Sequence, residues 1–422
     1  MTACALGSVD VDALDLEGIL LGLDNGDFTS QDLVDTYMSR ITQINTQVRA
    51  VGCLNPDARA IAIERDQQRR EGLHLGALHG VPLLVKDTIV TADGMDTTGG
   101  SYALVGAKYS HEATVVTKIR DAGGIILGKT NLSQWGMSRS QKCPSGWTSL
   151  FGQAVGGFHE SQDPQGSSSG SAIAACQNLA AATIGGEISR LSQFSLRVLI
   201  FLGKDEQDQA TKDIITLHHD SRLQTGMPSD WSCQYGNCVY TTADSDPEVG
   251  AAFKAAIDKI HTLGATIVDD IDFDHWKPGS GQREDLFGDI LLREALEKFF
   301  STMSLNPNDI KNISDLIEFI KSTPEEQYGK FGAEWFESAR DAPWTSTSDA
   351  FLEVKGKMEN LGKDVERPLD GFAITFAGRK FSEETILSCA YSFEQATKVA
   401  NVNREKLKIK PRNELKGGNG KN

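Results

Sequence analysis

Apolar residues recur at helical spacing through the first 75 positions of the chain. One predicted helix is followed by a second that begins after Thr29, where Thr29 and Asp32 form a capping pair. A third helix is predicted to begin at Asn55–Pro56 and to end at Gly72. The apolar faces of the first two helices hold Leu14, Ile19, Leu20, Leu23, Leu33, Tyr37, Ile41 and Ile44. Residues 1–75 are therefore predicted to form a helical region.

The hydrophobic pattern changes after Gly80, where apolar residues follow one another without a break. Residues 81–85 and 125–127 are each predicted to form a buried strand, and residues 112–122 between them a helix. Strand, helix and strand at this spacing predict a βαβ unit in a parallel or mixed sheet. The sequence therefore indicates the α/β fold class.

A long stretch rich in Gly, Ser and Gln, residues 136–171, has little periodicity. Loops of this length in compact domains are usually functional. After it, residues 172–182 are predicted to form a helix made almost entirely of small residues. Alternation of helices and strands then resumes, with predicted elements at 247–263, 265–268, 286–300, 310–322, 324–339, 373–376 and 382–400.

Charge and composition exclude several classes of partner. The net charge of −16 disfavours nucleic acid and anionic membranes, both of which need a concentrated basic surface. No apolar run is long enough to span a membrane, and acidic residues interrupt the N-terminal apolar stretch, so no signal peptide is predicted. A cytoplasmic location follows as the default expectation.

Metal binding is also not expected. The seven cysteines are scattered, and the spacing of Cys233 and Cys238 is too wide for a CxxC site, so free thiols are predicted. His79 and His111 have no ligand partners at metal-binding spacing. We expect neither a metal nor a cofactor.

The first candidate for chemistry is Lys86, which ends the apolar strand over 81–85. Burial disfavours an ammonium group, so a lysine in such a place can be neutral and act as a base. The alternative is an ordinary lysine at a strand end that faces solvent and pairs with Asp87.

The second candidate is the Ser/Gly stretch Gly166–Ser171, which directly precedes the predicted helix of small residues. Hydroxyl and N–H groups at a helix N-terminus make a polar pocket that tolerates an anion. A flexible linker is the alternative, but the helix that follows is too apolar to be exposed. The Gly-Lys-Ser/Thr of a phosphate-binding P-loop is absent.

Five segments carry a resemblance to a known family. They are residues 76–87 (GALHGVPLLVKD), 122–132 (AGGIILGKTNL), 152–153 (GQ), 166–172 (GSSSGSA) and 371–379 (GFAITFAGR). In this order they resemble the amidase signature family of Ser-Ser-Lys hydrolases, in its fungal type. The resemblance implies a mixed, twisted β-sheet with helices on both faces, formed by residues 76–403 and followed by a flexible tail over 404–422.

The resemblance also implies a reaction, acyl transfer from a small-molecule amide. Neutral Lys86 would accept a proton from Ser167, which the family holds by a cis peptide bond, and Ser167 would deprotonate a nucleophilic serine. Backbone N–H groups near Gly186 and Ile188 would form the oxyanion hole. Gly136 and Met137 would contact the substrate.

The sequence departs from the family where the nucleophile should stand. The family pattern Gly-Thr-Asp/Glu-Thr-x-Gly-Ser aligns with residues 185–191, and its serine falls on Leu191, which has no nucleophilic atom. Ser189 and Ser192 are the nearest serines and could replace it. The side chain of Ile188 also restricts a turn that glycine would allow.

An internal excision near residues 188–196 is the simplest explanation of this departure, and a second excision is expected near 365–369, where a late strand-forming region of the family has no counterpart. They would remove central strands and expose unpaired sheet edges. The sequence thus leaves three interpretations open: an impaired or active amide hydrolase, a catalytically silent binding protein with an amidase-like pocket, and a non-functional fragment.

Overall fold

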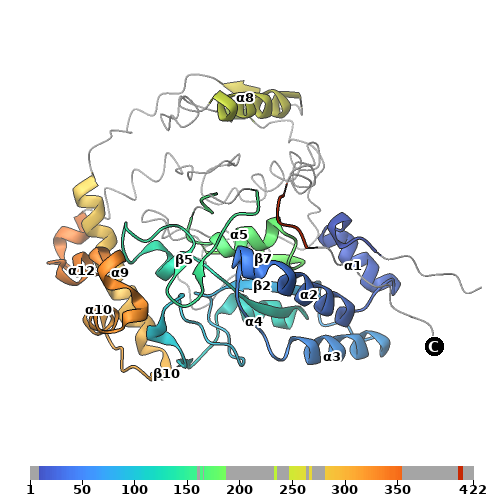
Figure 1. Cartoon of the computed structure of the whole chain (residues 1–422), viewed down its shortest axis with the longest axis horizontal. Coiled ribbons are helices and arrows are strands. Elements are labelled where there is room, and N and C mark those ends of the chain that lie inside the picture. Colours follow the sequence, from blue (N-terminus) through green and yellow to red (C-terminus); the bar gives the residue numbers. More distant parts are fainter. Residues whose placement is uncertain are drawn as a thin grey trace, which may run out of the picture. The chain divides into compact units, whose positions relative to one another are not determined.

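The computed structural model describes residues 9–158, 162–164, 166–186, 232–234, 247–262, 266–268, 281–353 and 407–411 (Figure 1). The chain divides into two compact units. Unit 1 comprises residues 1–195, 288–343 and 401–422, and unit 2 comprises residues 196–287 and 344–400. The predicted boundaries at 75 and 403 stay predictions.

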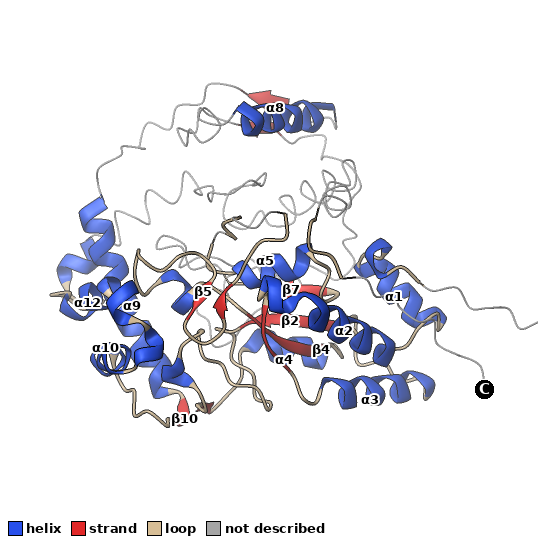
Figure 2. Ribbon diagram, in the orientation of Figure 1, coloured by secondary structure: helices blue, strands red, loops and turns tan. Residues whose placement is uncertain are grey.

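The core of unit 1 is a four-stranded mixed sheet with the order β1-β4-β2-β7. Its strands are β1 (Val51–Leu54), β4 (Ile125–Thr130), β2 (Pro82–Lys86) and β7 (Ala182–Ile184). Strand β2 runs parallel to both of its neighbours, β4 and β7, whereas β1 is antiparallel to β4 (Figure 2). All five residues of β2 are buried, as a strand between two others requires. The predicted α/β fold with a mixed sheet is confirmed.

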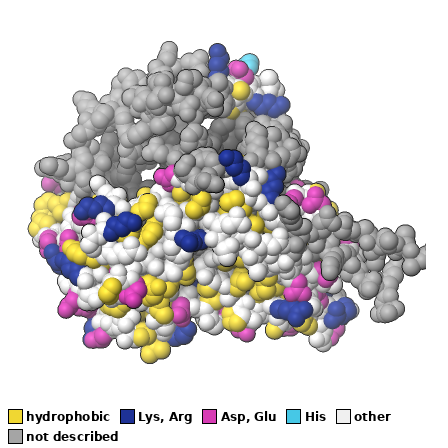
Figure 3. Space-filling view, viewed as in Figure 1, with side chains coloured by type: hydrophobic (Ala, Val, Ile, Leu, Met, Phe, Trp, Pro, Cys, Tyr) yellow, Lys and Arg dark blue, Asp and Glu magenta, His cyan; other side chains and the backbone are white. Residues whose placement is uncertain are grey.

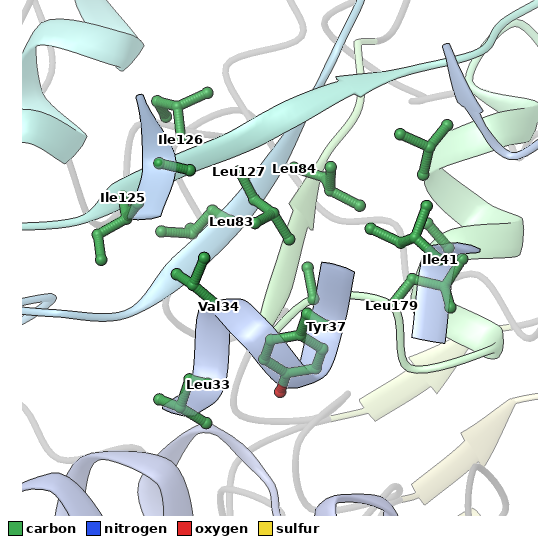
Figure 4. Packing of buried hydrophobic residues seen from close by; sticks show 14 of the residues in the cluster. Leu33, Val34, Tyr37, Ile41, Leu83, Leu84, Ile125, Ile126, Leu127 and Leu179 are labelled. Atoms are coloured by element: carbon green, nitrogen blue, oxygen red, sulfur yellow. The ribbon is translucent and has the colours of Figure 1, made fainter. Parts of the chain in front are cut away.

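Helices cover this sheet and share one hydrophobic core with it. They are α1 (Leu16–Asn25), α2 (Ser30–Val48), α3 (Ala58–Arg70), α4 (Thr114–Asp121) and α5 (Ser169–Cys176). Figure 4 shows Val34 and Tyr37 of α2 lying against Leu83 of β2 and Leu127 of β4, all of them buried. Each fully buried side chain of this kind contributes roughly 1.5–3 kcal/mol to folding.

A second hydrophobic cluster in unit 1 joins segments that are distant in the sequence. Its helices are α9 (Gly281–Ser301), of which residues 288–301 belong to this unit, α10 (Ile313–Ser322), α11 (Tyr328–Phe331) and α12 (Glu334–Asp341). Ala103, Leu104 and Trp135 pack among the apolar residues of these helices. Next to this cluster, β3 (Lys108–Tyr109) pairs with β10 (Met303–Leu305). The cluster therefore attaches residues 288–343 to the N-terminal part of the chain.

Each unit also contains a small pair of strands. In unit 1, β5 (Trp147–Thr148) and β6 (Gly152–Gln153) form an antiparallel hairpin. In unit 2, β8 (Ser232–Gln234) pairs in parallel with β9 (Thr266–Val268), and α8 (Pro247–Thr262) connects them in the sequence. The predicted helix over 247–263 and strand over 265–268 are thus confirmed.

Local sequence signals predicted several elements well. Thr29 and Asp32 form the expected capping box at the start of α2. The cap of α3 differs from the prediction, because the helix begins after Asp57, while the Asn55 side chain accepts a hydrogen bond from the Asp57 N–H at 3.0 Å. Strand β1 lies inside the predicted helical region and was not predicted.

Two predicted helices are shorter than expected, each for a backbone reason. The predicted helix over 324–339 is a short 3₁₀ turn followed by α11 and α12, because Gln327 and Gly332 have left-handed φ values of 51° and 63°. The helix over 172–182 begins earlier, at Ser169, and ends at Cys176, shortly before Asn178 at φ 51°.

Other predictions fall on residues that the structure does not describe. These are the strand over 373–376, the helix over 382–400 and both proposed excisions. Of the predicted tail, residues 407–411 are described, and there the Lys408 N–H donates to the Gly157 carbonyl at 2.9 Å.

The described residues show how charge is distributed on one face and whether any helix could span a membrane. Acidic and basic side chains are interspersed over the described part of the face drawn in Figure 3. Among the described helices, none combines the length and the apolar character that crossing a membrane requires.

Candidate active site

Lys86 ends the central strand β2, and its side chain is completely buried. Its Nζ donates a hydrogen bond to the Ser167 Oγ at 2.9 Å. The two candidates that the sequence singled out therefore lie in direct contact. The alternative of a lysine that faces solvent is wrong, because the Lys86 side chain is buried. The Asp87 carboxylate accepts hydrogen bonds from Thr98 and Gly100.

Gly186 is the third predicted site residue at this place. The Ser168 hydroxyl donates to the Gly186 carbonyl at 2.9 Å and accepts from the Gly186 N–H at 3.0 Å. The Ser167 hydroxyl is 3.4 Å from the same carbonyl. A Cβ on Gly186 would lie 3.9 Å from the Lys86 Nζ. The chain that leaves β7 is thus held beside the Lys86–Ser167 pair.

The backbone at Ser167 differs from the expectation drawn from the family. Every peptide bond among the described residues is trans, including those that flank Ser167, so the expected cis bond is not found. A trans bond is favoured by about 3–4 kcal/mol for residues other than proline. With the trans backbone, the Ser167 hydroxyl already reaches the Lys86 amine.

The segment that follows β4 makes a close backbone contact with the Ser/Gly stretch. The Gly170 N–H donates to the Asn131 carbonyl at 3.1 Å, and a Cβ on Gly170 would lie 2.2 Å from that oxygen. Only glycine permits this close approach of the two backbones. This contact fixes where helix α5 begins relative to the strand ends.

Gly136 and Met137 lie in a turn with left-handed backbone, at φ 65° and 70°, next to Trp135 at φ 54°. The N–H groups of Gly136 and Met137 both donate to the Ser133 carbonyl, at 2.8 and 3.3 Å. These N–H groups are therefore engaged within the turn, as the Gly186 N–H is engaged by Ser168. The Met137 side chain is half-buried, and the substrate contacts expected of Gly136 and Met137 stay predictions.

Two buried ionisable side chains close to Lys86, those of Asp87 and Lys129, were not foreseen from the sequence. Burial raises the pKa of Asp87 to about 6, although the nearby Lys129 and hydrogen bonds from Thr98 and Gly100 act in the opposite direction. Burial also lowers the pKa of Lys129, whose Nζ donates to the Ile89 carbonyl and to the Thr97 hydroxyl. Nothing near Asp87 in the sequence points to Lys129, which lies on the neighbouring strand β4.

A buried ion pair at the 133–139 turn was also not predicted from the sequence. It consists of Arg139 and Glu326. The Arg139 Nη1 is 3.0 Å from the Glu326 Oε2, and both side chains are fully buried. Gln134 joins this pair, because its amide nitrogen donates to Glu326 at 3.0 Å and its oxygen accepts from Arg139 at 2.5 Å. The turn next to the Ser/Gly stretch is thereby fixed to the loop that follows α10.

The residues predicted around the nucleophile lie outside the described part of the chain. They are Ile188, Ser189, Leu191 and Ser192. Among the described residues no group of three or more His, Cys, Asp or Glu side chains could hold a metal ion. The described site offers a buried amine in hydrogen-bond contact with a half-buried hydroxyl, an arrangement suited to proton transfer.

Known proteins that resemble this chain in sequence and in fold are amidases. The family model "Amidase" matches residues 32–189. A protein of Arthroderma benhamiae named "Putative amidase" is 27% identical, over 94% of this chain and 87% of its own length. The crystal structure of the native peptide amidase from Stenotrophomonas maltophilia, 27% identical, superposes with a TM-score of 0.72 over 83% of this chain and 80% of that one. That of PAM12A, 24% identical, shares the fold with a TM-score of 0.77 over 92% of this chain and 97% of that one.

The alignment with the Arthroderma protein is longer than this chain. It extends over 521 aligned residues, which is more than the 422 residues of this chain. The alignment must therefore pass through stretches of that protein that have no counterpart here.

Proposed function

This chain belongs to the amidase family, and from that premise we propose that it hydrolyses the carbon–nitrogen bond of amides through an acyl-enzyme. The observation that carries the proposal is the 2.9 Å contact between the Nζ of the buried Lys86 and the Oγ of the half-buried Ser167. A buried amine favours its neutral form, and a neutral amine can accept a proton from the hydroxyl that it touches.

The proposed reaction proceeds by proton transfer along this contact. Neutral Lys86 takes the hydroxyl proton of Ser167 as Ser167 takes the proton of a nucleophilic serine. The serine oxygen bonds to the amide carbonyl carbon, and the negative charge that develops on the carbonyl oxygen is stabilised by backbone N–H groups. The relayed proton passes to the amide nitrogen, and the carbon–nitrogen bond breaks to leave an acyl-enzyme. Water, deprotonated through the same Ser167–Lys86 relay, then attacks the acyl carbon and releases the carboxylic acid.

The nucleophile is the part of the proposal that rests on sequence alone. Leu191 stands at the family position for this serine, so Ser189 or Ser192 takes the role. Both follow Gly186, whose two hydrogen bonds with Ser168 place the chain beside Lys86. A displacement of about 1 Å can lower a rate about 10²-fold, so we propose a slow hydrolase.

The proposed substrate is a small amide of the peptide class. The native peptide amidase of Stenotrophomonas maltophilia shares both fold and 27% identity with this chain. The net charge of −16 supports a substrate that is neither a nucleic acid nor an anionic membrane.

A direct test uses the purified full chain with a fluorophosphonate and with small peptide amides. We expect a covalent adduct on Ser189 or Ser192 by peptide mass spectrometry, and release of ammonia from the amides. Lys86→Ala and Ser167→Ala should each lower the ammonia release by about 10²-fold or more. Leu191→Ser should raise it, because it restores a hydroxyl at the family position.

The matched control is Ser140→Ala, because Ser140 is 2% exposed and its hydroxyl accepts from the Lys142 N–H, away from Lys86. Its ammonia release should equal that of the wild type. Folded wild-type protein that forms no adduct and releases no ammonia, with Leu191→Ser equally inert, would exclude hydrolysis by this chain.

A second candidate function follows from Leu191 itself. A chain without a nucleophile but with the Lys86–Ser167 contact would bind small amides without cleaving them. We then expect small amides to raise the melting temperature of the wild type but not of Ser167→Ala, with no ammonia released. A chain that unfolds without a single cooperative transition would instead favour the third interpretation, a non-functional fragment.

A further inference from the structure

One serine outside the proposed relay bonds to both peptide groups that flank Ser167. The Ser133 hydroxyl donates to the Gly166 carbonyl at 2.8 Å, and the Ser133 N–H donates to the Ser167 carbonyl at 3.1 Å. The first carbonyl belongs to the peptide before Ser167 and the second to the peptide after it. A single residue thus determines the orientation of the Ser167 backbone.

The Ser167 backbone has few other restraints among the described residues. It lies outside helix α5, which begins at Ser169 with Ser168 as its N-terminal cap. The preceding Gly166 has a left-handed φ of 65°, and nothing lies within 4 Å of where its Cβ would be. The loop at Gly166 is therefore not held by side-chain packing, and its hydrogen bonds to Ser133 decide where the Ser167 hydroxyl points.

Ser133 is itself firmly held. Its side chain is 1% exposed, and its hydroxyl also accepts from the Gly146 N–H at 2.7 Å. Its carbonyl accepts from the N–H groups of Gly136 and Met137. The next residue, Gln134, is bonded to the buried Arg139–Glu326 pair. Every polar group of Ser133 is engaged, so the residue can serve as a rigid support.

From these contacts we propose that Ser133 is a positioning residue, which holds the Ser167 hydroxyl against the Lys86 amine. The inference rests on the proposed function, because its purpose is to align the Lys86–Ser167 relay. Ser133 touches neither substrate nor reacting atoms. Its loss would turn the Ser167 hydroxyl away from Lys86, which slows proton transfer without removing a group that transfers protons.

The kinetic test compares Ser133→Ala with Ser133→Thr, which keeps the hydroxyl, and with Ser140→Ala, an equally buried control. We expect Ser133→Ala to lower kcat about 10- to 100-fold with KM unchanged, and to shift the pH profile of kcat. Ser133→Thr should recover most of the rate. Should Ser133→Ala not fold, Ser133→Cys keeps the size while weakening both hydroxyl hydrogen bonds, and the same direction of change is expected.

A second measurement does not depend on turnover and separates this inference from the proposed function. In protein labelled with ¹⁵N at the lysine side chains, the Lys86 resonance is identified by its absence from Lys86→Gln, and its titration midpoint is measured. We expect Ser133→Ala to move this midpoint and Ser140→Ala to leave it in place, even if the wild type hydrolyses nothing. A midpoint and a kcat for Ser133→Ala that both equal those of Ser140→Ala would overturn the assignment.

Discussion

The Arg139 guanidinium and the Glu326 carboxylate meet at 3.0 Å in the interior of unit 1, with no exposure of either side chain. They are 187 residues apart in the sequence. The Glu326 carboxylate also accepts from the Ser101 hydroxyl at 2.7 Å and from the Tyr102 N–H at 2.8 Å. Such full hydrogen bonding is what allows a charged pair to be buried.

Breaking this pair from one side should be more damaging than removing both partners. Glu326→Leu leaves the Arg139 charge buried and unpaired, so we expect a loss of about 3–5 kcal/mol in the free energy of unfolding. The double variant Arg139→Met with Glu326→Leu should lose less than the single one, because no charge is left without a partner. Urea unfolding of the single and double variants measures the difference. A double variant that is less stable than Glu326→Leu would contradict this reading of the pair.

Gly170 should tolerate no side chain. In Gly170→Ala the new Cβ would stand 2.2 Å from the Asn131 carbonyl oxygen and 2.5 Å from that of Ala50, and both are backbone atoms that cannot turn aside. We expect a loss of more than about 3 kcal/mol. The matched control is Gly329→Ala in α11, where nothing lies within 4 Å, and it should be neutral or slightly stabilising. Thermal unfolding of both variants provides the comparison.

Asp87 should make stability depend on pH. Its pKa in the folded protein, about 6, is higher than the ordinary value of 3.8, so between these values the folded state keeps a proton that the unfolded chain has lost. The contribution of Asp87 to stability therefore falls as the pH rises from about 4 to about 6. Relative to Asp87→Asn, the wild type should lose at most about 1.4 kcal/mol per pH unit over this range.

This pH prediction is checked by urea unfolding at closely spaced pH values. Asp35→Asn, which removes an exposed carboxylate, controls for the loss of one negative charge. If the difference between the wild type and Asp87→Asn does not change between pH 4 and pH 6, the Asp87 carboxylate is already ionised across this range and the prediction fails.

Neighbouring serines of the Ser/Gly stretch should respond differently to removal of their hydroxyls. The Ser168 hydroxyl holds Gly186 through two hydrogen bonds, so Ser168→Ala should increase the rate of hydrogen exchange at the Gly186 amide. The Ser169 hydroxyl is buried and has no hydrogen-bond partner among the residues that the structure describes, so Ser169→Ala should leave that rate unchanged and keep or raise the stability. Equal exchange at Gly186 in both variants would show that Ser168 does not hold it.

The parts of the fold that the sequence predicted are those set by neighbouring residues. The capping box of Thr29 and Asp32 and the apolar run of β2 are local signals, and both are confirmed. Strand β1 has no such signal, because its four residues form a strand only by pairing with β4, far along the chain. The same holds for Arg139 and Glu326, which nothing in the sequence connects.

The candidate site likewise has features that the local sequence predicted and features that only the fold determines. Lys86 and Ser167 were found because each stands in a recognisable segment, and the structure brings them together. The role of Ser133 could not be read from the sequence, since it depends on carbonyl oxygens whose positions only the fold determines. The cis peptide bond came from the family and not from a residue of this chain, and it is absent from the described residues.

The second hydrophobic cluster of unit 1 joins two segments of the chain that are distant in the sequence. Trp135 meets Phe336 and Phe300 edge to face, with ring centroids 5.9 and 6.4 Å apart, so packing contacts hold residues 288–343 to the earlier part of the unit in addition to the covalent chain. Two polypeptides separated between residues 235 and 246 should therefore assemble in trans and purify together. Unit 1 would then be suited to fragment complementation, with its reconstitution reporting on the proximity of two fused proteins.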